Sequence, residues 1–114
     1  FLLVDWEEDH AENWDANNLL CKLRTWQTSD ISLGPTYQGN FMMALKSIKA
    51  KSILMPCTQD LYFPPEDNAI EASHMTHAEF RPFDSPWGHC AANPGNDADF
   101  TQALEKSLQE LLEY

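Results

Sequence analysis

Basic residues are scarce in this chain. Lys and Arg together number 7 against 18 Asp and Glu, which gives a formal net charge of −11. A surface of this sign repels phosphate backbones and anionic lipids, so we expect neither nucleic acid nor a membrane among the partners. The sequence also lacks any apolar run near the ~20 residues that a membrane-spanning helix needs.

Cysteine is rare and widely spaced. Cys21, Cys57 and Cys90 lie far apart and form no CxxC pair. This pattern argues against a disulfide framework and against a structural zinc site, and it favours a reducing compartment, so we expect a cytoplasmic protein. We expect each thiol to serve as a small buried apolar residue.

Three widespread functional motifs are absent as well. The sequence has no GxGxxG, no P-loop and no GxSxG, so it offers no dinucleotide or phosphate cradle and no nucleophile elbow. We expect no metal and no resident cofactor. The 114 residues suffice for one small domain at most and begin with Phe1 rather than Met, so we expect a processed product or a piece of something longer. No serine stands in a GxSxG context, at Ser29, Ser32, Ser47, Ser52, Ser73, Ser85 or Ser107.

What the chain does contain is a set of regular apolar spacings. They predict a helix over 15–27, which begins at the N-cap Asp15 and carries an apolar stripe from Leu19 to Trp26. Two later helices have clear start signals. Prolines followed by acidic residues open the first of them, at 64–67, and Asp97 caps the second. The other expected helices are a weak one over 1–14, one over 40–49, one opening at Pro64-Pro65, and a last one after Asp97 with Phe100, Leu104, Leu108, Leu111 and Leu112 turned inward.

Two short apolar runs, 52–57 and 78–83, indicate strands, and a predicted helix separates them. A strand-helix-strand unit in one sheet is parallel with a right-handed crossover. Pro82 weakens the second strand, and a long loop follows over 84–96. Two strands do not make a stable sheet. The fold class expected is therefore α/β, as the C-terminal part of a larger sheet.

One acid and one imidazole follow these two strands. Asp60 lies just past the first run and His89 past the second, and the carboxyl ends of parallel strands share one edge of a sheet. A carboxylate that accepts from a ring N–H fixes the imidazole as a proton acceptor for a hydroxyl. Gly88 removes a side chain beside the ring, and Trp87 can exclude water. The alternative is that Asp60 and His89 are unrelated loop residues.

Other candidates are weaker. His74 and His77 are three residues apart on a predicted helix, a spacing that permits two metal ligands, but neither an HExxH pattern nor a third ligand accompanies them. Cys90 adjoins His89, yet sequence neighbours project differently, which disfavours a Cys-His pair. The acidic cluster at 7–9 is more typical of a solvated face than of a metal site.

Three segments in this order resemble homoserine O-acetyltransferase-like α/β-hydrolases. The stretch 14–32, with WDANNLL and LRTWQ, resembles the lid region of that family. MPCTQDLYFPPEDN at 55–68 resembles the loop with the catalytic acid, and AEFRP followed by SPWGH, within 78–89, resembles the segment with the catalytic histidine.

The resemblance implies a division of labour. Asp60 would be the triad acid and His89 the general base, with the serine elbow and oxyanion loop before Phe1. Residues 1–37 would belong to a helical lid and 38–114 to the C-terminal part of the core. The family moves an acetyl group from acetyl-CoA to a hydroxyl through an acyl-serine, so the partners would be small molecules, and many members are homodimers built through lid helices.

One position departs from the family pattern. Better-characterised members often carry an acidic residue directly after the histidine, and here that residue is Cys90. A thiol cannot replace the charge that would pair with the amino group of homoserine. Hydrolysis and acyl transfer use the same machinery and differ in whether water or an alcohol reaches the acyl-enzyme.

Three functions remain open from the sequence. The first is the C-terminal portion of a serine-dependent acyltransferase or esterase. The second is a truncated or degenerate product without catalysis, and the third is a metal hydrolase that uses His74 and His77. We expect this chain by itself to show no measurable acyl transfer. Turnover of p-nitrophenyl acetate that His89→Ala abolishes would contradict this.

Overall fold

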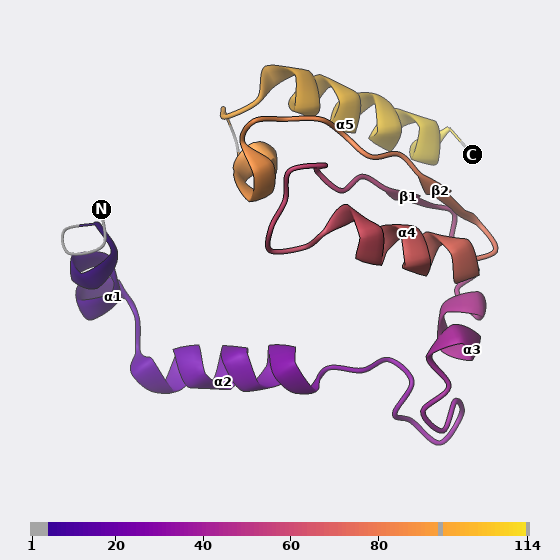
Figure 1. Ribbon diagram of the computed structural model, residues 1–114, viewed down its shortest axis with the longest axis horizontal. Coiled ribbons are helices and arrows are strands. Elements are labelled where there is room, and N and C mark those ends of the chain that lie inside the picture. The colour runs from indigo at the N-terminus through magenta and orange to yellow at the C-terminus, as the bar shows by residue number, and fades with distance from the viewer. Residues whose placement is uncertain (1–4, 94, 114) are drawn as a thin grey trace.

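A computed structural model describes residues 5–93 and 95–113. The predicted order of helices and strands is confirmed (Figure 1). Of the weak helix predicted over 1–14, the part from Glu7 onward is present and 1–4 lie outside the described residues. The elements are α1 (Glu7–Asn13), α2 (Ala16–Thr28), α3 (Phe41–Lys46), β1 (Ser52–Leu54), α4 (Pro65–His74), β2 (Ala78–Phe80), the 3-10 helix η2 (Gly88–Ala92) and α5 (Ala98–Leu112).

The helices α2 and α5 begin at the capping residues that the sequence predicted for them. The Asp15 carboxylate accepts from the N–H groups of Asn17 and Asn18 at the start of α2, and the Asp97 carboxylate accepts from the Phe100 N–H in α5. These bonds satisfy backbone donors that the first helical turn leaves without a partner. α4 begins with Pro65 in its first turn, where a missing N–H costs nothing.

β1 and β2 pair in parallel, with Ile53 opposite Glu79. A further parallel pair joins Cys57 to Phe83. The ladder is interrupted before this pair because Pro56, which accepts from the Phe83 N–H, has no N–H of its own to donate to the neighbouring strand. The predicted parallel arrangement is therefore confirmed, while the regular strands are shorter than the runs from which they were predicted.

Four predicted elements need correction. The helix expected over 40–49 ends at Lys46. The Ser47 N–H is shared between the Met43 and Ala44 carbonyls, and the Ile48 N–H bonds the Leu45 carbonyl three residues back, so the last turn tightens and the helix stops. The strands expected over 52–57 and 78–83 keep a continuous ladder only in β1 and β2. The expected loop over 84–96 contains η2.

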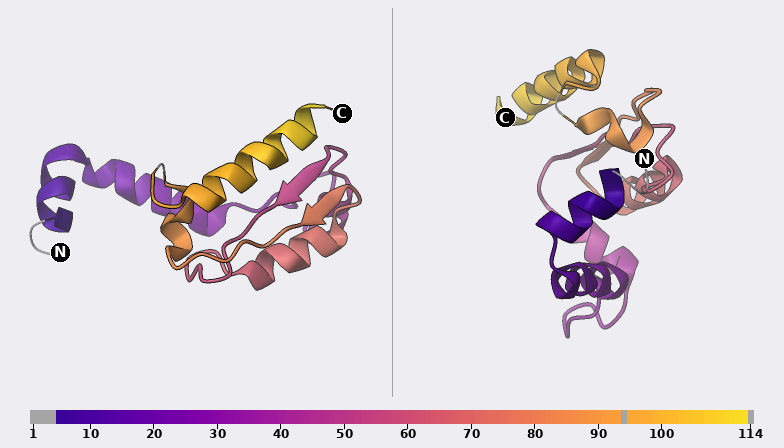
Figure 2. Two further views of the ribbon diagram at one scale, coloured as in Figure 1. Left: turned by 90° about the horizontal axis from the view of Figure 1, so that it is seen from above. Right: turned by 90° about the vertical axis from the view of Figure 1, so that its left-hand side faces the viewer.

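Helices cover both faces of the two-stranded sheet, with α4 on one side and α5 on the other (Figure 2). Residues alternate along β2 and just beyond it. Phe80 and Pro82 line a shallow hollow with Ala69 of α4. Arg81 and Phe83 contact α5 instead. This is the layer arrangement of an α/β protein.

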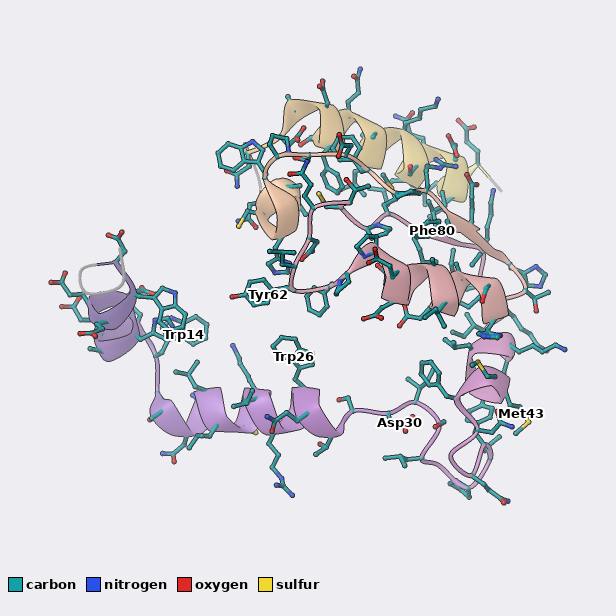
Figure 3. All side chains as sticks on the ribbon, in the orientation of Figure 1. Trp14, Trp26, Asp30, Met43, Tyr62 and Phe80 are labelled. Atoms are coloured by element: carbon teal, nitrogen blue, oxygen red, sulfur yellow. The ribbon has the colours of Figure 1, made fainter. Side chains whose placement is uncertain are left out.

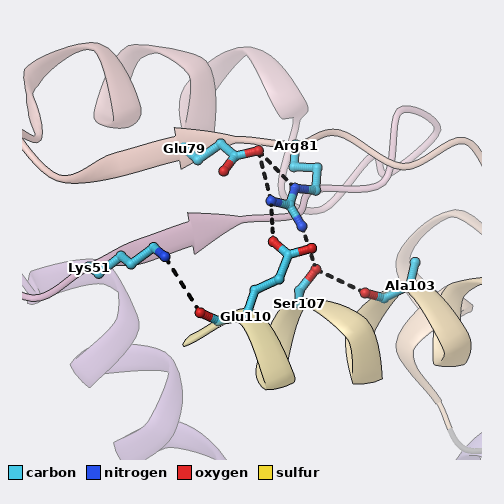
Figure 4. Close-up of polar contacts among 6 residues, drawn as sticks. All are labelled: Lys51, Glu79, Arg81, Ala103, Ser107 and Glu110. Atoms are coloured by element: carbon cyan, nitrogen blue, oxygen red, sulfur yellow. Dashed lines mark hydrogen bonds and ion pairs between the residues drawn. The ribbon is translucent and has the colours of Figure 1, made fainter. Parts of the chain in front are cut away.

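The Arg81 guanidinium ties the sheet to α5 (Figure 4). It donates to the carboxylates of Glu79 and Glu110, with a shortest N···O distance of 2.8 Å to each, and to the buried Ser107 hydroxyl at 2.9 Å. The hydrogen bond from Arg81, together with its positive charge, holds the pKa of Glu110 below the ordinary value for Glu. The planar, forked guanidinium suits this role because it reaches several acceptors at once.

A small apolar cluster anchors α5 to the end of the sheet. Cys57, Ala91 and Phe100 are buried, and Met55 and Phe83 pack against them. The rings of Phe83 and Phe100 meet edge to face, with centroids 5.2 Å apart. The predicted burial of Cys57 is confirmed.

Two sets of buried residues predicted from the sequence prove exposed. Cys21 in α2 and Cys90 in η2 are exposed thiols. In α5, Phe100 and Ser107 are buried, whereas Leu104, Leu108 and Leu112 are exposed, as are Leu20, Leu23 and Trp26 of α2.

The described chain is more open than a closed domain of its length. Its radius of gyration is 17.3 Å, against about 13 Å for a compact domain of this size. Its accessible surface is 8916 Å², whereas a folded monomer of this mass exposes roughly 6300 Å². The apolar faces of α2 and α5 account for part of this surface. No helix among residues 5–93 and 95–113 is long and apolar enough to cross a membrane.

Candidate active site

The Asp60 carboxylate lies at the carboxyl end of the sheet, in the loop between β1 and α4. One oxygen, Oδ1, accepts from the Tyr62 N–H at 2.8 Å and from the Phe63 N–H at 3.0 Å. Such an Asx turn is a local structure that an Asp favours in a loop. The other oxygen, Oδ2, accepts from Nδ1 of His89 at 3.0 Å. The backbone thus holds one oxygen and leaves the other for the imidazole.

His89 enters from the second strand's side, in the first turn of η2. The residue before it, Gly88, has φ +51°, and a Cβ at this position would lie 2.8 Å from the Gln59 carbonyl oxygen. Only glycine therefore allows the histidine turn and the acid loop to approach this closely. The sequence predicted Gly88 as a residue that makes room, and the room it makes is for the backbone beside Asp60.

The two members of the pair differ in exposure. The Asp60 side chain keeps 10% of its accessible surface and the His89 side chain 44%. Partial burial raises the pKa of Asp60, but hydrogen bonds from the Phe63 N–H, the His89 ring and the Tyr62 N–H outweigh it and leave that pKa below the ordinary Asp value. The carboxylate therefore stays ionised at neutral pH and keeps Nδ1 protonated, so that Nε2 is the nitrogen able to accept a proton.

Aromatic rings of the acid loop flank the imidazole. The Tyr62 and Phe63 rings lie 4.7 and 5.3 Å from the His89 ring, centroid to centroid. The sequence assigned the exclusion of water to Trp87, which is exposed. The rings that contact the imidazole belong instead to Tyr62 and Phe63, shortly after Asp60. In the sequence, two adjacent aromatic residues this close to the candidate acid could have indicated them.

A small cavity of about 100 Å³ adjoins the pair. Its walls combine the end of β1 with η2 and α5. Asp60 and His89 both line it, together with apolar groups of Met55, Pro56, Cys57, Phe63, Gly88, Ala91, Ala92 and Phe100 and the side chain of Asn68.

A buried clamp that the sequence did not reveal supports the histidine turn. The Ser85 hydroxyl donates to Asp97 Oδ2 at 2.5 Å and accepts from the Trp87 N–H at 3.2 Å, and the Gly88 N–H donates to the Ser85 carbonyl at 3.2 Å. Hydrogen bonds from the Ser85 hydroxyl and from the Phe100 N–H hold the pKa of Asp97 below the ordinary Asp value. The cap of α5 thereby fixes the turn that carries His89.

The other sequence candidates are not brought to this site. His74 ends α4, whereas His77, which was predicted on the same helix, lies beyond it in the turn before β2. The exposed Cys90 lies in η2. The acidic cluster at 7–9 forms the first turn of α1. Within residues 5–93 and 95–113, no three His, Cys, Asp or Glu side chains gather where they could hold a metal ion.

Comparisons with known proteins find relatives that are named as ester hydrolases. No protein-family model matches the chain. An ethyl acetate hydrolase of Pseudomonas veronii is 38% identical over 98 residues, which are 86% of this chain and 27% of that protein. A probable esterase of Corynebacterium glutamicum is 30% identical over 112 residues, which are 98% of this chain and 31% of that protein.

A solved structure is similar as well. The trigonal crystal structure of an acetylester hydrolase from Corynebacterium glutamicum matches with a TM-score of 0.79 at 28% identity, and the match covers 95% of this chain and 32% of that one. These relatives are named as hydrolases, and none of the three is named as an acyltransferase. Along nearly its whole length the chain is therefore similar to esterases with an α/β arrangement, and it spans about a quarter to a third of the length of each.

Proposed function

We propose that Asp60 and His89 are the acid and the general base of a serine-type ester hydrolase. The observation that carries the proposal is the 3.0 Å hydrogen bond between Asp60 Oδ2 and His89 Nδ1, which leaves Nε2 as the proton acceptor. The serine is supplied by a longer protein that includes this chain, here called the nucleophile-bearing protein. The similarity to esterases over most of this chain supports the assignment.

The roles of the two residues follow from their chemistry. His89 takes the proton of the serine hydroxyl as its oxygen attacks the ester carbonyl, and then gives that proton to the departing alcohol. Water then enters and attacks the acyl carbonyl while His89 takes one of its protons, and His89 returns that proton to the serine oxygen as the bond to the acid breaks. Asp60 orients the ring and stabilises its protonated form in both steps.

Hydrolysis is the more strongly supported of the two reactions that this pair serves, because the relatives are named as hydrolases. The homoserine O-acetyltransferase-like reaction would differ in the acyl donor, which is acetyl-CoA instead of an ester, and in the acceptor, which is a hydroxyl instead of water. In either case we assign residues 1–37 to a lid over the pocket and 38–114 to the C-terminal part of an α/β-hydrolase core. Lid helices then offer a surface for a homodimer.

The decisive experiment compares two Asp→Asn variants of the nucleophile-bearing protein. Asp60→Asn should lower kcat for p-nitrophenyl acetate by about 10⁴, because the ring loses its orienting acceptor. Asp67→Asn, in the exposed first turn of α4, should leave kcat within about twofold, as is usual for a surface change.

Similar losses in both variants would mean that the wrong acid has been chosen. Wild-type protein without esterase turnover would support the reading of a non-catalytic product. Faster product formation with homoserine and acetyl-CoA than with esters would favour transfer over hydrolysis.

A further inference from the structure

Three aromatic side chains form a continuous surface beside His89, here called the aromatic wall. Tyr62 and Phe63 lie 4.7 and 5.3 Å from the imidazole centroid. The Trp26 ring, from α2, packs on Phe63 with centroids 5.7 Å apart. Figure 3 shows Trp26 pointing from α2 toward the loop that carries Tyr62. The wall therefore joins the acid loop to the segment assigned to the lid.

The wall is exposed and held in place. Tyr62, Phe63 and Trp26 keep 65%, 48% and 57% of their accessible surface, which leaves their faces free for an apolar group. The N–H groups of Tyr62 and Phe63 are the two donors that hold Asp60 Oδ1. The turn that fixes the acid thus also fixes the direction in which two of the three rings project.

The chemistry of the pair says which part of an ester meets these rings. His89 gives its proton to the departing alcohol, so the alcohol oxygen must come within hydrogen-bond reach of the imidazole. The carbon group attached to that oxygen then lies beside whatever flanks the ring. The acyl group instead follows the carbonyl carbon to the serine.

We infer that the aromatic wall receives the alkyl group of the ester's alcohol, and that Trp26 is a specificity-determining residue for it. The inference rests on the proposed function. The preferred substrates are esters of uncharged, apolar alcohols, because the three rings offer apolar surface and no charged partner. Trp26 acts through substrate contact and through the position of Phe63, and it takes no part in proton transfer.

The expected effect follows from apolar burial. A methylene that is fully removed from water improves binding about fourfold, and one covered on a single side about twofold. With the nucleophile-bearing protein, kcat/KM should therefore rise about twofold per methylene from ethyl to butyl to hexyl acetate. In Trp26→Ala this rise should largely disappear, while Trp26→Phe should retain most of it.

The matched series varies the acyl group instead, from ethyl acetate to ethyl butyrate and ethyl hexanoate, and Trp26→Ala should change its slope little. Trp6→Ala is the control variant, because Trp6 is 53% exposed and packs on His10 of α1. In Trp6→Ala, the dependence of kcat/KM on alcohol length and its dependence on acyl length should both equal those of the wild type. If Trp26→Ala does not fold, Tyr62→Ala should flatten the alcohol series in its place.

The outcomes separate the two proposals. An alcohol series that stays steep in the folded Trp26→Ala protein, or equal flattening of both series, overturns the inference while Asp60→Asn still abolishes turnover. Turnover that survives Asp60→Asn overturns the proposed function and the inference with it.

Discussion

Gly88 offers the sharpest test of how the histidine turn is held against the acid loop. Replacing it with alanine places a Cβ 2.8 Å from the Gln59 carbonyl oxygen, whereas ordinary van der Waals contact begins at 3.4 Å. This oxygen belongs to the backbone directly before Asp60 and cannot rotate away. Either the acid loop or the imidazole must move.

Two effects add in Gly88→Ala. The left-handed φ of +51° costs a residue with a Cβ about 1 kcal/mol of folding stability. The displaced backbone also changes the geometry of the Asp60–His89 pair, and a misplacement near 1 Å costs on the order of 10²-fold in rate. We therefore expect kcat of the nucleophile-bearing protein to fall roughly 10- to 100-fold.

Two other glycines separate these effects. Gly39 has φ +83° and no atom within 4 Å of an added Cβ, and Gly34 has no such φ and is equally open. Gly39→Ala should lose about 1 kcal/mol in urea unfolding with kcat unchanged, and Gly34→Ala should change neither. Gly88→Ala that matches Gly39→Ala in both stability and kcat would refute the argument from close approach.

Two further predictions concern the acid and the core. Because the folded pKa of Asp60 lies below its ordinary value of 3.8, the ionised acid stabilises the fold fully above pH 3.8, and this contribution should fade as pH drops through the lower folded pKa. Urea unfolding of wild type and Asp60→Asn from pH 7 to pH 2 measures it, and a difference that grows on acidification would contradict the sign. Phe100→Ala should cost about 3 kcal/mol in the same unfolding assay, because it opens a cavity in the cluster with Cys57 and Ala91. Gln102→Ala, on the exposed side of α5, should stay within about 0.5 kcal/mol, and equal losses would mean that Phe100 is not part of the core.

Signals in the sequence were sufficient to predict the helices and strands and the meeting of Asp60 with His89. Asp15 and Asp97 cap their helices because a side chain can satisfy a backbone donor only a few residues away. The meeting of Asp60 and His89 followed from the parallel direction of the strands, since both carboxyl ends reach one edge.

Burial along the helices could not be predicted in the same way. Apolar periodicity indicates which face of a helix is apolar, but not what covers it. Leu108 was expected inside and is exposed, because the contacts of α5 with the sheet centre on Ser107 and Phe100. The same applies to Trp26, whose partner lies in a loop far along the chain.

By itself, the sequence determined the helices, because these depend on spacing within a few turns of chain. It also determined that an acid and an imidazole lie at one edge, because a strand-helix-strand order makes the strands parallel and brings their carboxyl ends together. Only the tertiary structure decided which neighbours hold that pair. The Gln59 carbonyl against Gly88 and the Ser85–Asp97 clamp join residues whose separation no periodic pattern encodes. Such contacts arise when whole elements pack, so they depend on three-dimensional distances that sequence spacing does not specify.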